Sequence, residues 1–231
     1  MNARTQQFEV TVEGRQVEEA LSCVFHTLLL HRSTGKFTYT ADANYSIGSV
    51  GTEDIDCDFI DLTYVRVSSR ELAQALRCDI TAFRDALRQA DVLPGSSSEI
   101  RQGRVTLEFF QRKRRQWPLP EDVVPWEQWH VYVQCVHCQS DNDQRRMREL
   151  AADSLADIVY SIATEINKPV YVPKMPMRSD MPLIFDNRFV DVQPYLFRVD
   201  HEIVSRNSYS DQGGPRISST FKRLLKDTFV M

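Results

Sequence analysis

Three stretches of the sequence repeat apolar residues at steps of three and four, the spacing that gathers them on one side of an α-helix. The predicted helices run from Val17 to near Ser33-Thr34-Gly35, from an N-cap at Ser68-Ser69 to about Leu87, and from about Asp143 to Asn167. Each helix must bury its apolar stripe against another layer of structure. The stripes are Val17, Ala20, Leu21, Val24, Phe25 and Leu28; Leu72, Leu76, Ile80, Phe83 and Leu87; and Met147, Leu150, Ala151, Leu155, Ile158, Val159, Ile162 and Ile166.

The segments between these helices have the alternation and turn residues of β-strands. Pro- and Ser-containing residues 88–103 predict a surface loop, as do the polar residues 205–215, and residues 217–231 form a terminal amphipathic segment. Because helices alternate with strand pairs and no linker divides the chain, we expect one α+β domain over residues 1–231. The strand candidates are KFTYT (36–40), NYSIGSVG (44–51), FIDLTYVRV (59–67), RVTLEFF (104–110) and QWHVYVQCV (128–136).

Charge argues against a protein whose main task is neutralising phosphates. The 231 residues include 28 Lys and Arg against 32 Asp and Glu, for a formal net charge of −4. The N-terminus lacks the basic and then apolar layout of a secretory signal, and no apolar stretch is long enough to span a membrane, so we expect a cytoplasmic location. We expect the five cysteines to remain reduced, mostly buried thiols.

Three clusters of polar residues raise the question of chemistry. Cys135 and Cys138 form a C-x-x-C, but no second ligand pair completes a zinc site, and residues three apart on a strand face opposite sides. The acidic residues between 53 and 61 alternate with apolar ones, as in a half-buried strand. His26, His31 and Arg32 lie near the end of the first helix, where cations interact favourably with the helix dipole. We therefore expect no catalytic residues, no metal and no cofactor.

A different kind of site is indicated between the strands ending near residue 110 and beginning near residue 128. Residues 111–125, here called the finger, contain Arg112, Lys113, Arg114 and Arg115, followed by Trp117, Pro118 and Leu119. Two interpretations remain open: the apolar side chains fold back into the core, or they form an exposed apolar tip ringed by positive charge. An exposed tip of this kind suits a protein groove, an anionic membrane or nucleic acid.

Eight segments, in order, resemble the autophagy-related protein 101 family, the HORMA-domain subunits of the kinase complex that initiates autophagy. They are VEGRQVEEA (12–20), LLLHRSTGKF (28–37), YSIGSVGTEDIDCDFIDLTYVRVSS (45–69), LEFFQRKRRQWP (107–118), PWEQW (125–129), YVPKMP (171–176), DVQPYLFRV (191–199) and FKRLLKDT (221–228). The resemblance implies a HORMA domain of three helices packed on a mainly antiparallel β-sheet, without enzyme activity.

The resemblance also implies partners. These are the HORMA domain of autophagy-related protein 13, as a heterodimer stabilising that partner, and the initiation kinase with its scaffold subunit, at the autophagosome formation site. The family finger recruits downstream autophagy factors through a tryptophan, a proline and a phenylalanine; Trp117 and Pro118 match, whereas Leu119 replaces the phenylalanine. We expect the dimer face to include His31, Arg32, Asp54 and Asp56. The alternatives are direct binding of anionic membrane or nucleic acid by the finger, and a thiol enzyme using Cys135 and Cys138.

Overall fold

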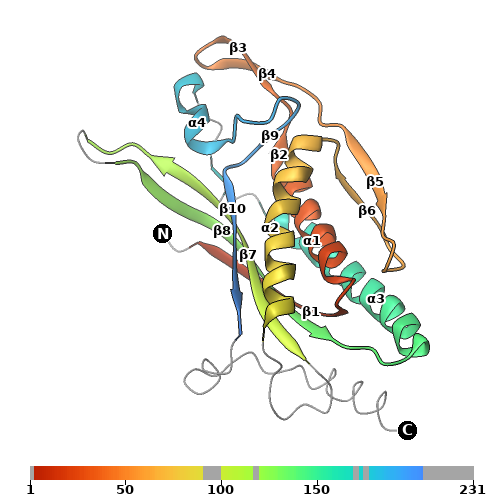
Figure 1. Cartoon of the computed structure of the whole chain (residues 1–231). Helices are drawn as coiled ribbons and strands as arrows, with labels where there is room; N and C mark the ends of the chain where they lie inside the picture. Colours follow the sequence, from red (N-terminus) through yellow and green to blue (C-terminus); the bar gives the residue numbers. More distant parts are fainter. Residues whose placement is uncertain (1–2, 91–99, 117–119, 169–171, 174–176, 205–231) are drawn as a thin grey trace.

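The computed structural model describes residues 3–90, 100–116, 120–168, 172–173 and 177–204, and it has a mixed α+β fold (Figure 1). The C-terminal amphipathic segment at 217–231 and the polar loop at 205–215 lie outside these residues. In chain order the elements are β1 (Arg4–Glu13), α1 (Val17–His31), β2 (Ser33–Thr34), β3 (Phe37–Ala41), β4 (Asn44–Ile47), β5 (Thr52–Asp56), β6 (Thr63–Val67), α2 (Arg70–Gln89), β7 (Arg101–Lys113), β8 (Asp122–Val136), α3 (Asp141–Ile166), η2 (Arg178–Asp180), α4 (Met181–Ile184), β9 (Gln193–Pro194) and β10 (Phe197–Ile203).

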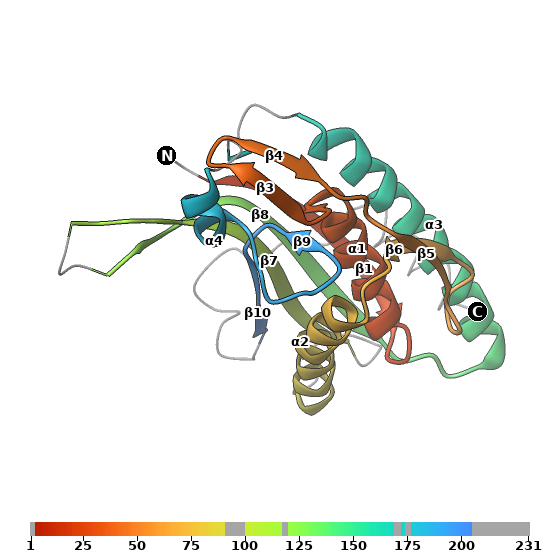
Figure 2. The same ribbon diagram turned by 90° about the horizontal axis from the view of Figure 1, so that it is seen from above.

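The main sheet has the strand order β1-β8-β7-β10. Strand β1 runs parallel to β8, while β7 pairs antiparallel with both β8 and β10. The helices α1, α2 and α3 lie together on one face of this sheet (Figures 1 and 2). Two antiparallel hairpins, β3–β4 and β5–β6, stand apart from the sheet, and β6 packs beside α1.

The apolar stripes of the predicted helices form the core between helices and sheet. Phe25 on α1, Phe83 on α2 and Leu155 on α3 are all fully buried. The inward residues of β7 and β8 alternate along each strand, which gives Trp129 and Phe109 their place under the helices. Strand β7 approaches α2 closely at Gly103. A Cβ atom at this position would lie only 2.6 Å from Cε2 of Phe83, so a larger residue would not fit without a shift.

The helix limits follow local capping chemistry. Ser69 accepts a hydrogen bond from the backbone N–H of Leu72 at the start of α2, and Ser140 does the same for Asp143 at the start of α3. The sequence interpretation was confirmed for α2 and α3 to within about two residues. The first helix was expected to end near Ser33-Thr34-Gly35, and α1 ends two residues before Ser33, at His31, because Ser33 and Thr34 pair with β9.

Two strand assignments require correction. The predicted run 59–67 is interrupted, since residues 57–62 turn the chain between β5 and β6 and only Thr63–Val67 is a strand. The strands near the finger are longer than predicted, because β7 extends to Lys113 and β8 begins at Asp122. Pro125 lies within β8 beside a register shift, where Phe109 pairs with Glu127 and Phe110 pairs with Pro125. This irregularity accommodates a residue that has no N–H to donate to the ladder.

Candidate functional site

An apolar groove runs between α1, α3 and β6 on the outside of the molecule. It encloses about 470 Å³ and none of its lining residues is Asp, Glu, Lys or Arg. We call it the α1–α3 groove; its lining residues are Thr27, Leu30, His31, Leu62, Thr63, Tyr64, Val65, Ala156, Val159, Tyr160 and Ala163. Two of its side chains are strongly exposed for apolar residues, Tyr160 at 76% and Val65 at 40%. A contiguous exposed apolar surface of this kind is typical of a protein contact site.

His31, one of the predicted dimer residues, contributes to the wall of this groove. Burial, together with the neighbouring Arg32 guanidinium, lowers the pKa of His31 below its ordinary value. The imidazole is therefore neutral at pH 7, which keeps the groove without charge.

Asp54 and Asp56 lie at the edge of the same surface. In the β5–β6 hairpin Asp54 pairs with Val65 and Asp56 pairs with Thr63, and paired residues of antiparallel strands share a face. Both aspartates are exposed, so they add negative charge beside the apolar groove. The half-buried character predicted for the acidic segment is confirmed for β5, where exposed and half-buried residues alternate.

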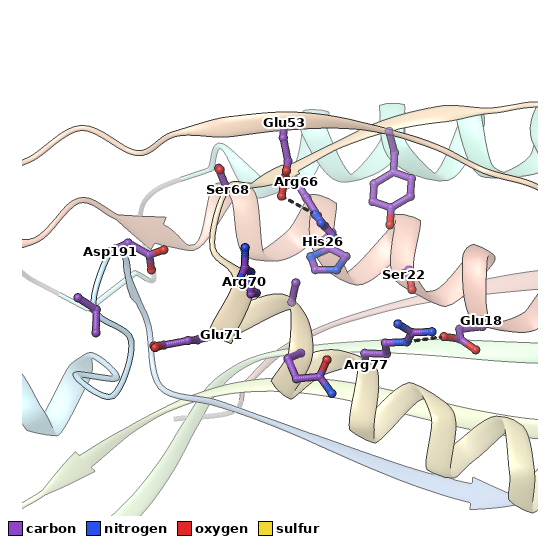
Figure 3. Close-up of a pocket in the computed structure, with 14 residues that line it drawn as sticks. Glu18, Ser22, His26, Glu53, Arg66, Ser68, Arg70, Glu71, Arg77 and Asp191 are labelled. Carbon is purple, nitrogen blue, oxygen red and sulfur yellow. Dashed lines mark hydrogen bonds and ion pairs between the residues drawn. The ribbon is translucent and has the colours of Figure 1, made fainter.

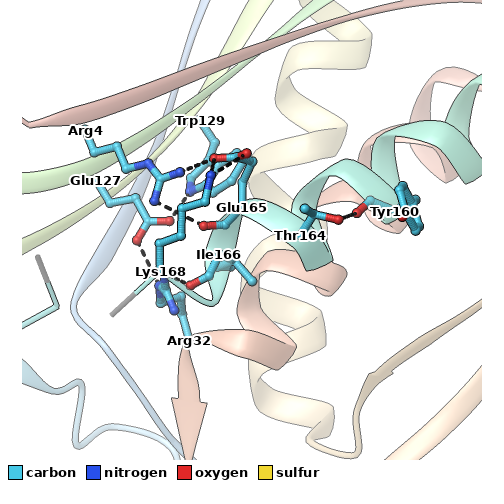
Figure 4. Close-up of polar contacts among 9 residues, drawn as sticks. All are labelled: Arg4, Arg32, Glu127, Trp129, Tyr160, Thr164, Glu165, Ile166 and Lys168. Atoms are coloured by element: carbon cyan, nitrogen blue, oxygen red, sulfur yellow. Dashed lines mark hydrogen bonds and ion pairs between the residues drawn. The ribbon is translucent and has the colours of Figure 1, made fainter. Parts of the chain in front are cut away.

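Arg32, another of the predicted dimer residues, has a buried side chain. Its side chain is only 7% exposed, and Nε donates to Oε2 of Glu127 at 2.8 Å while Nη2 donates to the backbone carbonyl of Ile166 at 3.0 Å (Figure 4). The expectation that Arg32 belongs to a dimer face stays a prediction, and in the structure a buried partner from β8 holds its side chain inside. Arg32 thus ties the end of α1 to β8 and to the end of α3.

The ends of β1 and α3 are joined next to this ion pair. Arg4 donates to the backbone carbonyl of Glu165 at 3.1 Å and pairs with the Glu165 carboxylate, which also accepts from Lys168 (Figure 4). Glu127 completes its bonding by accepting from the indole N–H of Trp129. Both walls of the α1–α3 groove are therefore anchored at the same end by polar contacts.

The basic residues of the finger lie where β7 and β8 extend beyond the rest of the sheet (Figure 2). Trp117, Pro118 and Leu119 fall outside the described residues. Two of the four cations are engaged within the chain: Arg114 donates to the carbonyl of Ser179 at 2.7 Å, and Arg115 pairs with Asp122. Arg112 and Lys113 are exposed and form no ion pair with any other described residue.

Cys135 and Cys138, the residues considered for a thiol enzyme, have the properties of structural thiols. Cys135 and Cys138 are free, and burial raises the pKa of both, that of Cys138 to about 11. A thiol with a raised pKa is a poor nucleophile at pH 7. His130, which lies near them in sequence, interacts through Nδ1 with the Thr106 hydroxyl at 2.8 Å. Within the described ranges, no three His, Cys, Asp or Glu side chains are arranged to hold a metal ion.

None of the described helices is both long and apolar enough to cross a bilayer. The sequence reasoning proposed His31, Asp54 and Asp56 for a dimer face but did not single out Tyr160 and Val65, which are exposed in the groove. A signal for Tyr160 was available, since Ala156, Val159, Tyr160 and Ala163 form a second apolar stripe on the third helix.

The comparisons with known proteins agree with the resemblance. The family model described as Autophagy-related protein 101 matches residues 9–179. The chain is 44% identical to Autophagy-related protein 101 of Xenopus tropicalis over 231 residues, covering all of both chains, and 44% identical over the same length to that of Homo sapiens. A plant relative, Autophagy-related protein 101 of Arabidopsis thaliana, is 23% identical over 186 residues, covering 71% of this chain and 77% of the plant protein.

Proposed function

The chain belongs to the autophagy-related protein 101 family and so has a role in autophagy, and from this premise we propose that it is a non-catalytic adaptor of the autophagy-initiation kinase complex. As a single HORMA domain, it forms a heterodimer with the HORMA domain of autophagy-related protein 13 and stabilises that partner. It brings this pair to the kinase and its scaffold subunit, in the cytoplasm and at the autophagosome formation site. The matched family is named for autophagy and not for a reaction, which agrees with an adaptor.

The observation that supports the heterodimer is the exposed apolar surface of the α1–α3 groove. The Tyr160 side chain is 76% exposed, so its ring contributes binding free energy only when a partner buries it. For a residue at the centre of an interface this contribution is about 2 kcal/mol or more. His31 lies in the wall of this groove and the exposed Asp54 and Asp56 lie at its rim, where charge selects the partner. Arg32 acts from inside, by holding the walls of the groove.

The heterodimer is tested by light scattering on a gel-filtration column, with the chain alone and mixed with the partner HORMA domain. We expect a one-to-one complex, and we expect Tyr160→Asp to weaken binding by about thirtyfold or more, because a charge replaces a buried ring. Met177→Asp is the matched control, since Met177 is 60% exposed and lies outside the groove. Two unmixed peaks with the unaltered chain, or equal losses from both variants, would contradict this assignment.

A second part of the proposal assigns recruitment of downstream autophagy factors to Trp117, Pro118 and Leu119. Support comes from the strands that carry the finger: they project from the body, Arg114 just beyond the end of β7 contacts Ser179 and Asp180, and Val123 is 48% exposed. A braced support presents a short apolar tip at little cost in conformational entropy.

We expect Trp117→Ala to abolish capture of downstream factors while leaving the complex with the partner HORMA domain intact, because no described residue of β7 or β8 lines the α1–α3 groove. The measurement is affinity capture from cell extract, with Tyr160→Asp as the reciprocal control. Sedimentation with acidic vesicles at two salt concentrations distinguishes the membrane alternative, since a charge-driven contact weakens as salt rises. If Trp117→Ala changes neither vesicle binding nor the capture of downstream factors, the finger has neither function.

A further inference from the structure

A second groove, on the other side of α1, is polar and larger than the α1–α3 groove. It encloses about 890 Å³ between α1, the first half of α2 and the β5–β6 hairpin (Figure 3). We call it the α1–α2 groove. Its floor carries Glu18, Ser22 and His26, which follow one another at intervals of four along α1. The volume is within the range of sites that bind small molecules or peptide segments.

Positive charge gathers at the end of this groove where α2 begins. Arg66 on β6 and Arg70 in the first turn of α2 both line it, with the hydroxyl-bearing Ser68 between them in sequence. In Figure 3 the Arg70 side chain rises from the start of α2 toward the β5–β6 hairpin. The N-terminus of the twenty-residue helix α2 adds partial positive charge at the same place.

Four carboxylates line the groove, and one of them, Asp191, lies at this end, where it accepts from the Ser69 hydroxyl at 2.7 Å. Glu53 accepts from Arg66 at 2.8 Å, and Glu18, farther along, pairs with Arg77 and Arg84. Among the described residues Arg70 forms neither an ion pair nor a side-chain hydrogen bond. Glu71 points away from Arg70 in Figure 3. Within the described residues the groove therefore has one guanidinium without an ion pair, on Arg70, and a second, on Arg66, that pairs with Glu53.

His26 adds a third nitrogen donor to this end of the groove. It is 5% exposed, lines the groove, and stacks on Tyr64 with ring centroids 6.0 Å apart. Its ring nitrogens form no hydrogen bond with any described part of the chain and are not fully enclosed by it, so they are accessible from the groove. A neutral imidazole N–H aimed into a groove, beside two guanidinium groups, is suited to donate to an anionic oxygen.

We propose that this end of the α1–α2 groove binds a phosphate monoester carried on a polypeptide, with Arg70, Arg66 and His26 donating to its oxygens. A dianion with three acceptor oxygens matches two guanidinium groups and an imidazole better than a single carboxylate does. The length of the groove beyond the phosphate accepts the flanking backbone. A bilayer surface cannot enter a recess between a helix pair and a hairpin, which favours a peptide.

The test is a titration of the full chain, followed by NMR, with the blocked tripeptide Gly-phosphoserine-Gly at constant ionic strength. We expect saturable shifts of the His26 ring signals, and we expect Arg70→Gln to weaken binding at least tenfold. Arg88→Gln is the matched control, because Arg88 is exposed on the same helix and does not line the groove. It should change the dissociation constant less than twofold.

Further arms separate the ligand classes. The tripeptide with glutamate in place of phosphoserine should bind at least tenfold more weakly, and inorganic phosphate should bind more weakly than the phosphopeptide. Equal binding of the glutamate peptide would overturn the phosphate assignment, and equal binding of inorganic phosphate would overturn the peptide assignment. Shifts that do not saturate, or that Arg70→Gln leaves unchanged, would overturn the site altogether.

Discussion

Replacing Arg32 with methionine is expected to lower the free energy of unfolding by about 3–5 kcal/mol, the usual cost of removing one partner from a buried ion pair. The variant leaves the Glu127 carboxylate, whose side chain is 1% exposed, without its counter-charge, and it removes the donor to the Ile166 carbonyl at the end of α3. The methionine side chain fills most of the space of the aliphatic part of the arginine side chain, so most of its apolar contacts are kept. Chemical denaturation monitored by circular dichroism measures the change.

Matched variants show whether the buried charge is the cause. Arg77→Met removes an arginine that is 69% exposed and also pairs with a glutamate, and it should cost less than about 1 kcal/mol. The double variant Arg32→Met/Glu127→Leu should be more stable than Arg32→Met alone, because no charge is left unpaired. Equal losses from Arg32→Met and Arg77→Met would mean that the Arg32–Glu127 pair contributes no more than a surface contact.

The helices could be predicted because each signal is local. Four-residue spacing of Leu72, Leu76 and Ile80, with Ser69 as the cap, defines α2 without knowledge of the rest of the chain. The extension of β7 and β8 could not be predicted in this way. Pro118, Pro120 and Pro125 argue against strands, and the ladder around Pro125 forms only because the register shifts there.

The candidate site was predicted in part, because its components come from separate regions of the sequence. His31 ends one helix, Val65 lies on a hairpin strand, and Tyr160 lies on a helix about a hundred residues farther along the chain. Hydrophobic spacing indicates that Tyr160 is on a helix. It does not indicate that no other described element of the chain covers this side of α3. Arg32 shows a second limit: its place in the sequence predicted a dimer face, and its burial depends on Glu127 and the Ile166 carbonyl, which are far away in the sequence.

Lowering the pH from 7 to 4 is expected to remove about 3 kcal/mol of stability through His26 alone. Burial, with a further contribution from the Arg66 guanidinium, lowers the pKa of His26 from 6.5 to about 4. Between these values the unfolded chain binds a proton that the folded chain does not, so stability falls as the pH falls. The full contribution is present above about pH 6.5, and the loss is complete below about pH 4.

The measurement is the unfolding free energy of the chain and of His26→Phe at intervals between pH 4 and pH 7. Phenylalanine keeps a ring on Tyr64 but binds no proton, so the difference between the two curves isolates His26 from His31 and His130, whose pKa values are also lowered. The charged groups that line the groove with His26 are common to both proteins; they are Glu18, Glu53, Arg66, Arg70, Glu71, Arg77 and Asp191. Parallel curves would contradict the prediction. If His26→Phe does not fold, NMR titration of the His26 ring in the unaltered chain decides the matter, because a midpoint near 6.5 excludes a lowered pKa.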